Sequence, residues 1–158
     1  MHMKDQVAIV TGGGQGLGQA ICRRLAEAGA HVAVVDRNAD AAHATALELE
    51  NLSGRRALAV HADITVEDHV AAMVARTLET WGRIDLLVAN AGIVIAGQVT
   101  ELESADFRRV LDVNLTGYFL CAQYVAPIMK AQRRGVIIQI NSISGKRGSF
   151  GNGAYCAS

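Results

Sequence analysis

The 158-residue sequence has few cysteines, no excess charge and no long apolar run, and each absence excludes a class of protein. The three cysteines are scattered and without CxxC spacing, which argues against a disulfide framework and against a zinc site. Fifteen basic residues balance fifteen acidic ones, so no surface for nucleic acid is indicated. No apolar run approaches the roughly 18 residues that span a bilayer, and the N-terminus lacks the apolar segment of a secretory signal. We therefore expect a cytoplasmic protein without nucleic-acid or membrane partners.

Metal chemistry is not expected either. The five histidines share no spacing typical of metal ligands, and Cys156 is interpreted as a small packed residue and not as a nucleophile. Residues 1–3 are set aside, because Met1 and Met3 are alternative starts and His2 and Met3 could be a cloning remnant. One domain is expected over residues 4–158.

Short apolar stretches rich in β-branched residues alternate with longer segments of helical periodicity, as in repeated βαβ units. The stretches are continuously apolar, which is typical of parallel strands covered on both faces. The sequence therefore predicts an α/β fold with a doubly wound parallel sheet, the Rossmann fold, whose ligand crevice lies at the carboxyl ends of the strands. The expected strands are residues 7–10, 31–35, 57–61, 84–89 and 136–140.

Apolar stripes at helical spacing predict helices within residues 17–28, 42–49 and 70–78. A longer helix is expected from Ser104 to about Gln132. Ser104 is interpreted as its N-cap and Asp106 as part of an acidic first turn. Pro127 is expected to kink or end this helix.

A glycine-rich turn, TGGGQGLG, follows the first expected strand at residues 11–18. Strict GxGxxG spacing fails, because Leu17 occupies the third glycine position, but glycines stand at 12, 16 and 18. Such glycines let the backbone approach a pyrophosphate at a helix N-terminus. The alternative is that these glycines only form a strand-to-helix turn and bind no nucleotide. The residues predicted to bind a dinucleotide are Thr11, Gly12, Gln15, Gly16, Leu17 and Gly18.

Asp36 ends the second expected strand, 18 residues after Gly18, near the position of an acidic residue that binds an adenosine ribose. A carboxylate about 5 Å from a 2′-phosphate would be repelled by roughly 3 kcal/mol, which favours NAD over NADP. Arg37 is also predicted at the cofactor, where it could stack on adenine or pair with a 2′-phosphate. Alternatively, Asp36 is only the N-cap of the next helix.

Two further turns follow strands and are predicted to contact the cofactor. Asp63 and Ile64 come after the third expected strand, and Asn90, Ala91 and Gly92 after the fourth. The alternative is that these five residues only form ordinary turns and do not contact a cofactor.

These motifs together resemble the short-chain dehydrogenase/reductase family. The resemblance also rests on ANAG, where the family usually has NNAG, on Asn114 in DVNLTG, on Ser142 in INSIS, and on Tyr155, thirteen residues after Ser142. It covers essentially the whole chain. The stretches GYFLCA and IIQINSISGK are similar to the polyol and sugar-alcohol branch.

The resemblance implies hydride transfer between an NAD cofactor and a secondary alcohol or ketone. Tyr155 would be the general acid/base beside the cofactor, Ser142 would orient the substrate oxygen, and Asn114 would hold a water that relays protons. Taken singly, Ser142 could be a turn residue, Asn114 a locally bonded helix residue, and Tyr155 a packed aromatic. Ser144 competes with Ser142 and is assigned to the lining of the pocket.

The family places a lysine four residues after the tyrosine, at position 159, and further strands and helices beyond it. We therefore expect the domain to be incomplete at its C-terminus, the 158-residue chain alone to be inactive, and the full-length enzyme to be a homodimer or homotetramer. A non-catalytic NAD(P)-binding module and an NAD(P)H-dependent reductase of carrier-bound or steroid ketones are the alternatives.

Overall fold

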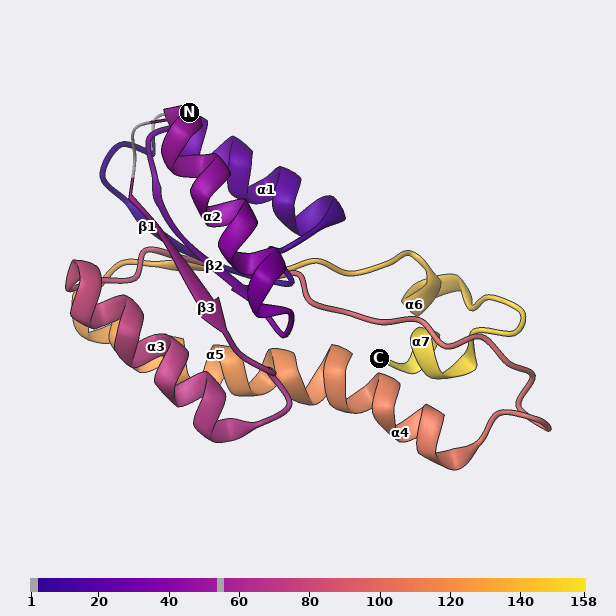
Figure 1. Cartoon of the computed structure of the whole chain (residues 1–158). Coiled ribbons are helices and arrows are strands. Elements are labelled where there is room, and N and C mark those ends of the chain that lie inside the picture. Colours follow the sequence, from indigo (N-terminus) through magenta and orange to yellow (C-terminus); the bar gives the residue numbers. More distant parts are fainter. Residues whose placement is uncertain (1–2, 54–55) are drawn as a thin grey trace.

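The computed structural model describes residues 3–53 and 56–158. Its centre is a five-stranded parallel sheet with the order β3-β2-β1-β4-β5 (Figure 1). The order runs outward in both directions from β1, which confirms the predicted doubly wound sheet. The strands are β1 (Val7–Thr11), β2 (His31–Asp36), β3 (Ala57–His61), β4 (Leu86–Ala89) and β5 (Val136–Gln139).

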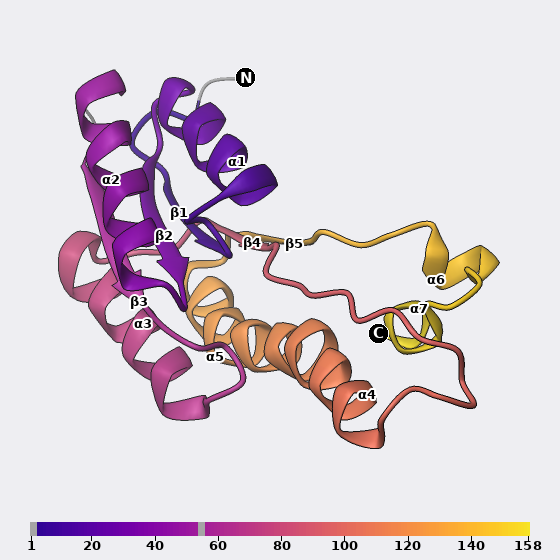
Figure 2. The same ribbon diagram turned by 45° about the vertical axis from the view of Figure 1, so that its right-hand side comes forward.

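Two layers of helices cover the sheet. On one face lie α1 (Gly16–Glu27) and α2 (Ala39–Ser53), and on the other lie α3 (Glu67–Trp81) and α5 (Gly117–Gln132) (Figures 1 and 2). The short helices α6 (Ser144–Arg147) and α7 (Gly153–Ala157) follow β5 and lie beyond the end of the sheet (Figure 2).

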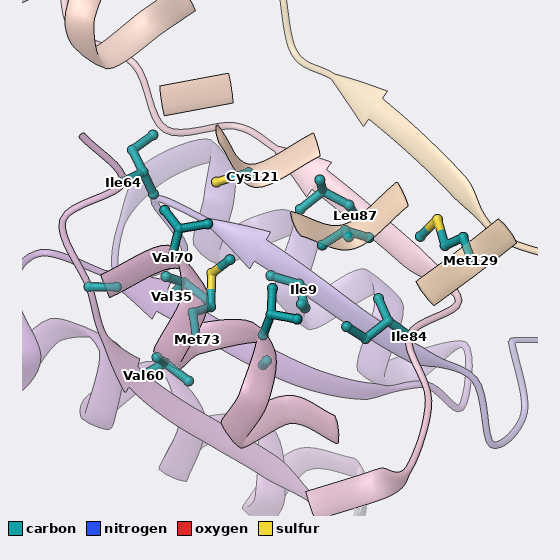
Figure 3. Packing of buried hydrophobic residues seen from close by; sticks show 14 residues of the cluster. Ile9, Val35, Val60, Ile64, Val70, Met73, Ile84, Leu87, Cys121 and Met129 are labelled. Carbon is teal, nitrogen blue, oxygen red and sulfur yellow. The ribbon is translucent and has the colours of Figure 1, made fainter. Parts of the chain in front are cut away.

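Alternate strand residues supply two cores, one on each face of the sheet. Ile9 packs with the side chains of α3 and α5 (Figure 3), whereas its neighbours Ala8 and Val10 pack with α1 and α2. Met3, which sequence reasoning set aside, is also buried, and its backbone N–H donates to the Ala28 carbonyl at 2.8 Å. Each buried branched side chain contributes roughly 1.5–3 kcal/mol to folding, so both helical layers are held by apolar burial.

β4 begins at Leu86, two residues later than predicted. The Gln132 side chain explains part of the difference, because its Oε1 accepts the Ile84 N–H at 3.1 Å and its Nε2 donates to the Ile84 carbonyl at 2.7 Å. The end of α5 thus takes the hydrogen bonds of Ile84 that a neighbouring strand would otherwise make.

The predicted long helix is one continuous rod with a change of hydrogen bonding inside it. α4 (Ser104–Leu111) leads into a π-helical segment, η1 (Asp112–Thr116), and then into α5. The prediction of Ser104 as N-cap is wrong: Glu103 occupies that position without a side-chain cap, because Ser104 already belongs to the first turn. Pro127 lies within α5 and does not end it.

Close packing accompanies the π-helical segment. The Gly117 N–H donates to the Asp112 carbonyl, five residues back, and a Cβ on Gly117 would lie 2.6 Å from Ile64 Cδ1. A side chain at position 117 would have to displace the Ile64 side chain, so glycine favours this close approach of the rod to the Ile64 turn.

A buried carboxylate joins the amino-terminal ends of the central strands. Asp85 Oδ2 accepts the Val7 N–H at 3.0 Å, and Oδ1 lies 2.7 Å from Arg83 Nη2 and 3.0 Å from Arg134 Nη2. Burial opposes ionisation of this carboxyl, but the hydrogen bonds from Arg83 and Val7 and the charges of the two arginines outweigh it. They hold the pKa of Asp85 below its ordinary value.

Replacing Asp85 by asparagine is expected to lower the free energy of unfolding by about 1–3 kcal/mol, because a charged acceptor is lost at a buried site. A depressed carboxyl pKa stabilises the fold above the unfolded-state value near 3.9 and stops doing so as pH falls through the folded-state value. Urea unfolding at pH 7 and pH 3 should therefore show a smaller difference between wild type and Asp85→Asn at pH 3.

The matched control is Glu27→Gln, which makes the same chemical change in the surface pair between Arg24 and Glu27. Such pairs contribute about 0–1 kcal/mol. An effect of Asp85→Asn no larger than that of the control would show that the buried carboxylate does not stabilise the sheet.

Candidate functional site

The strand order reverses between β1 and β4, and the turns after these two strands are locked together. Thr11, which is fully buried, accepts the N–H groups of Asn90 and Ala91 on its Oγ1, both at 3.1 Å. Asn90 Nδ2 donates in return to the carbonyls of Thr11 at 3.0 Å and Gly12 at 3.3 Å. The reversal point is therefore a rigid platform at the carboxyl edge of the sheet, where α/β proteins bind ligands.

The glycine-rich turn is shaped by backbone crowding. Gly12 and Gly16 have φ of +63° and +54°, the left-handed region that favours glycine. A Cβ on Gly18 would lie 2.0 Å from the Gly12 carbonyl oxygen and 2.6 Å from Asn90 Nδ2. The N-terminus of α1 therefore lies directly against the turn, as an anion-binding loop requires.

Asp36 is held at the end of β2 by two backbone donors. Its Oδ2 accepts the Gly14 N–H at 3.0 Å and its Oδ1 accepts the Asn38 N–H at 2.9 Å. Asn38 caps α2, because its Oδ1 accepts the Ala41 N–H at 3.1 Å. The alternative of Asp36 as that helix cap therefore does not hold.

Asp63 is ordered by its own turn. The Thr65 hydroxyl donates to Asp63 Oδ1 at 2.7 Å, and the Thr65 N–H donates to the same oxygen at 2.9 Å. The Thr65 hydroxyl bond is the main reason that the pKa of Asp63 lies below its ordinary value, with smaller contributions from the charges of Arg37 and His69. Asp63 is thus a fixed negative group beside the cleft.

Two cavities open at this edge. The larger, of about 460 Å³, is lined by the glycine-rich turn, by Asp36 and Arg37, by Asp63 and Ile64, and by the turn after β4. It gathers every residue predicted to bind the cofactor except Thr11 and Tyr155, which line the second cavity. Its walls also include four apolar residues that sequence reasoning missed: Val35, Ala62, Ile93 and Val113.

The smaller cavity, of about 230 Å³, contains Asn114 and Tyr155. It adjoins the larger one, since both are lined by Leu17, Ile64, Asn90, Ala91 and Gly92. Sequence reasoning did not assign Tyr118, Gln139, Asn141 or Ser158 to it. The position of Tyr118 one turn after Asn114, and of Gln139 and Asn141 at a strand end, could have indicated them.

Ser142 lines neither cavity. Its Oγ accepts the Ser144 N–H at 3.2 Å, a local turn bond. A hydroxyl can accept that bond and still donate its own hydrogen, so a role at the substrate oxygen stays a prediction. Ser144 lines neither cavity either, contrary to its assignment to the lining of the pocket.

Comparison with known proteins identifies this arrangement. The family model described as short chain dehydrogenase matches residues 6–158. The chain belongs to the short-chain dehydrogenase family.

Among the relatives of this short-chain dehydrogenase chain, sorbitol-6-phosphate 2-dehydrogenase of Escherichia coli K12 is 46% identical over 97% of the chain and 60% of its own length. A structure of NAD⁺-bound xylitol dehydrogenase matches with a TM-score of 0.96 and 32% identity over 99% of this chain and 60% of that chain. A structure of 7α-hydroxysteroid dehydrogenase complexed with NADH and 7-oxo glycochenodeoxycholic acid matches with a TM-score of 0.94 and 36% identity, over 99% of this chain and 61% of that chain. The chain therefore spans about 60% of the length of these relatives.

Two of the three thiols of this family member lie in the core. Cys22 and Cys121 are buried, and burial raises the pKa of each thiol to about 12. Within residues 3–53 and 56–158, no three histidine, cysteine or acidic side chains are placed to hold a metal ion. In the same part of the chain, no helix combines the length and apolarity needed to cross a bilayer.

Proposed function

We propose that this chain forms the cofactor-binding part of an NAD-dependent oxidoreductase that interconverts a secondary alcohol, such as a polyol or sugar alcohol, and a ketone. The observation that carries the proposal is the shared wall of the two cavities. The predicted dinucleotide cavity opens next to Tyr155 and Asn114, so cofactor and substrate would meet there. The relatives named for sorbitol 6-phosphate and xylitol support the polyol class.

The residues of the larger cavity fit a dinucleotide. Because Gly18 has no Cβ, the N-terminus of α1 can lie directly against the glycine-rich turn. The free N–H groups at the start of α1 can then bind a pyrophosphate. Asp36 keeps lone pairs free beyond its two backbone bonds and can accept the ribose hydroxyls. When bound, the nicotinamide supplies the hydride chemistry.

The residues of the smaller cavity would handle the proton. In alcohol oxidation Tyr155 accepts the hydroxyl proton, and in ketone reduction it donates a proton to the carbonyl oxygen. Ser142 lies outside the lining of both cavities, and we assign its hydroxyl, from the turn after β5, the role of donating a hydrogen bond to the substrate oxygen and orienting it. Asn114 and the side chains around it keep this end of the cleft polar.

Direct assay tests the proposal. The full-length protein should bind NAD and form NADH, followed at 340 nm, with members of a panel of secondary alcohols that includes polyols and their phosphates. Binding of NAD without turnover of any alcohol or ketone would favour the non-catalytic module. Activity confined to NADPH and carrier-bound or steroid ketones would favour the reductase.

Asp36 is expected to select NAD. The wild type should bind NAD roughly a hundredfold more tightly than NADP, and Asp36→Asn should reduce this ratio to about tenfold or less, because the repulsion of a 2′-phosphate is removed. Calorimetric titration with both cofactors measures the ratio. If the substitution only disrupted the hydrogen bonds of residue 36 to the Gly14 and Asn38 N–H groups, binding of both cofactors would weaken equally and the ratio of NAD to NADP affinity would not change.

The control is Asp40→Asn, an acidic residue in the first turn of α2 that does not line the larger cavity. Its NAD to NADP ratio should equal that of the wild type. Tighter binding of NADP than of NAD by the wild type would overturn the assignment of Asp36.

A further inference from the structure

Ser158 joins the two residues of the smaller cavity to which a proton-handling role is assigned. Asn114 Nδ2 donates to Ser158 Oγ at 2.9 Å, and Ser158 Oγ donates to the Tyr155 carbonyl at 3.0 Å. All three residues line the cavity. Ser158 therefore touches both the π-helical segment and the first turn of the helix that carries Tyr155.

The remaining bonds of the Asn114 amide show why this contact matters. Its Oδ1 accepts the Ile93 N–H at 2.8 Å, and its Nδ2 donates to the Ile93 carbonyl at 3.0 Å. The bond to Ser158 occupies the second hydrogen of Nδ2, so all hydrogens of the amide have acceptors. Rotating the amide by a half-turn would set Nδ2 against the Ile93 N–H, two donors facing each other.

We propose that Ser158 is a positioning residue for the proposed oxidoreductase reaction. Its hydroxyl holds α7 against the Asn114 amide and thereby sets the depth of Tyr155 in the smaller cavity. It acts through Asn114 and the Tyr155 backbone, to which its hydroxyl is hydrogen-bonded. The inference rests on the proposed function for its effect on rate, but the hydrogen-bond chain itself can be tested without turnover.

The kinetic test replaces Ser158 in the full-length protein. Ser158→Ala should lower kcat about fivefold to tenfold, the effect of losing a hydrogen bond in a partly buried network, while the dissociation constant for NAD is unchanged, because Ser158 does not line the larger cavity. Ser158→Thr keeps the hydroxyl and should restore most of the rate. Ser104→Ala, the same change on α4 outside both cavities, is the control and should equal the wild type.

A double-mutant cycle tests whether Ser158 acts through Asn114. Ser158→Ala should add little to the loss caused by Asn114→Ala, because the amide it holds is already absent. Losses that multiply in the double variant would overturn the coupling. Equal kcat in wild type and Ser158→Ala would overturn the positioning role.

Side-chain amide exchange, measured by NMR, gives a readout that needs no activity. The Asn114 Nδ2 hydrogens should exchange faster in Ser158→Ala than in the wild type and return to slow exchange in Ser158→Thr. Unchanged exchange in Ser158→Ala would refute the inference even if the protein oxidises alcohols. An inactive wild type with the expected exchange pattern would refute the proposed function but keep the hydrogen-bond chain.

Discussion

Tyr155→Phe is expected to lower kcat by about 10²–10⁴-fold, the usual contribution of a general acid or base. The change removes one oxygen and keeps the ring that lines the smaller cavity, so packing there should be preserved. NAD affinity should change by no more than about tenfold, because at most one hydrogen bond to the cofactor is lost. Steady-state kinetics at saturating NAD, combined with calorimetric titration, separate the two effects.

Tyr124→Phe is the matched control for this change. Tyr124 carries its phenol on α5, away from both cavities, where the hydroxyl donates to Glu67 Oε1 at 2.8 Å. Its removal should leave kcat unchanged and affect only stability. A Tyr155→Phe enzyme that retains its rate within a few fold would show that another group moves the proton.

Gly18→Ala is expected to cost the protein most of its NAD binding. A Cβ 2.0 Å from the Gly12 carbonyl oxygen cannot be accommodated without displacing the turn or α1. Asn90, whose Nδ2 is bonded to the carbonyl oxygens of Thr11 and Gly12, would be displaced with them. Overpacking of this kind costs about 1–3 kcal/mol. We expect NAD affinity to fall about tenfold to a hundredfold, together with a lower Tm.

Gly153→Ala supplies the comparison. A Cβ at Gly153, the first residue of α7, would meet no atom within 4 Å, and its φ is not positive. Alanine there should leave the Tm unchanged or raise it, since glycine in a helix costs roughly 0.5–1 kcal/mol relative to alanine. Wild-type NAD affinity in Gly18→Ala would mean that the turn does not bind the pyrophosphate.

The sheet and the edge at which the two cavities open could be predicted because their signals are local. Each strand is a short apolar run, and parallel order places every following turn at one edge, so Gly12, Asp36 and Asn90 converge without any knowledge of packing. The mutual hydrogen bonds of Thr11 and Asn90 could not be predicted, since they join residues 79 positions apart.

The departures lie where tertiary contacts override local pattern. Helical periodicity over residues 104–132 does not reveal the π-helical segment, which is accompanied by the close approach of Gly117 to Ile64. Ser142 Oγ accepts the Ser144 N–H within its own turn, and the 13-residue spacing to Tyr155 does not predict this bond. Ser158 could not be predicted as a site residue, because no spacing or periodicity in the sequence distinguishes it from other serines. Its importance is visible only once Asn114 is seen to lie against it.

The π-helical segment has a consequence for the rotational phase of the long helix. A turn closed by an i to i+5 bond contains one residue more than an α-turn, so the helix surfaces before and after it are offset by roughly 100°. In α5 the buried residues Cys121, Val125 and Met129 face the sheet. An offset of that size places Val110, which is buried on α4, about a quarter revolution from that line, and α4 packs against α7. The two ends of one rod thus pack against different partners, α5 against the sheet and α4 against the helix that carries Tyr155.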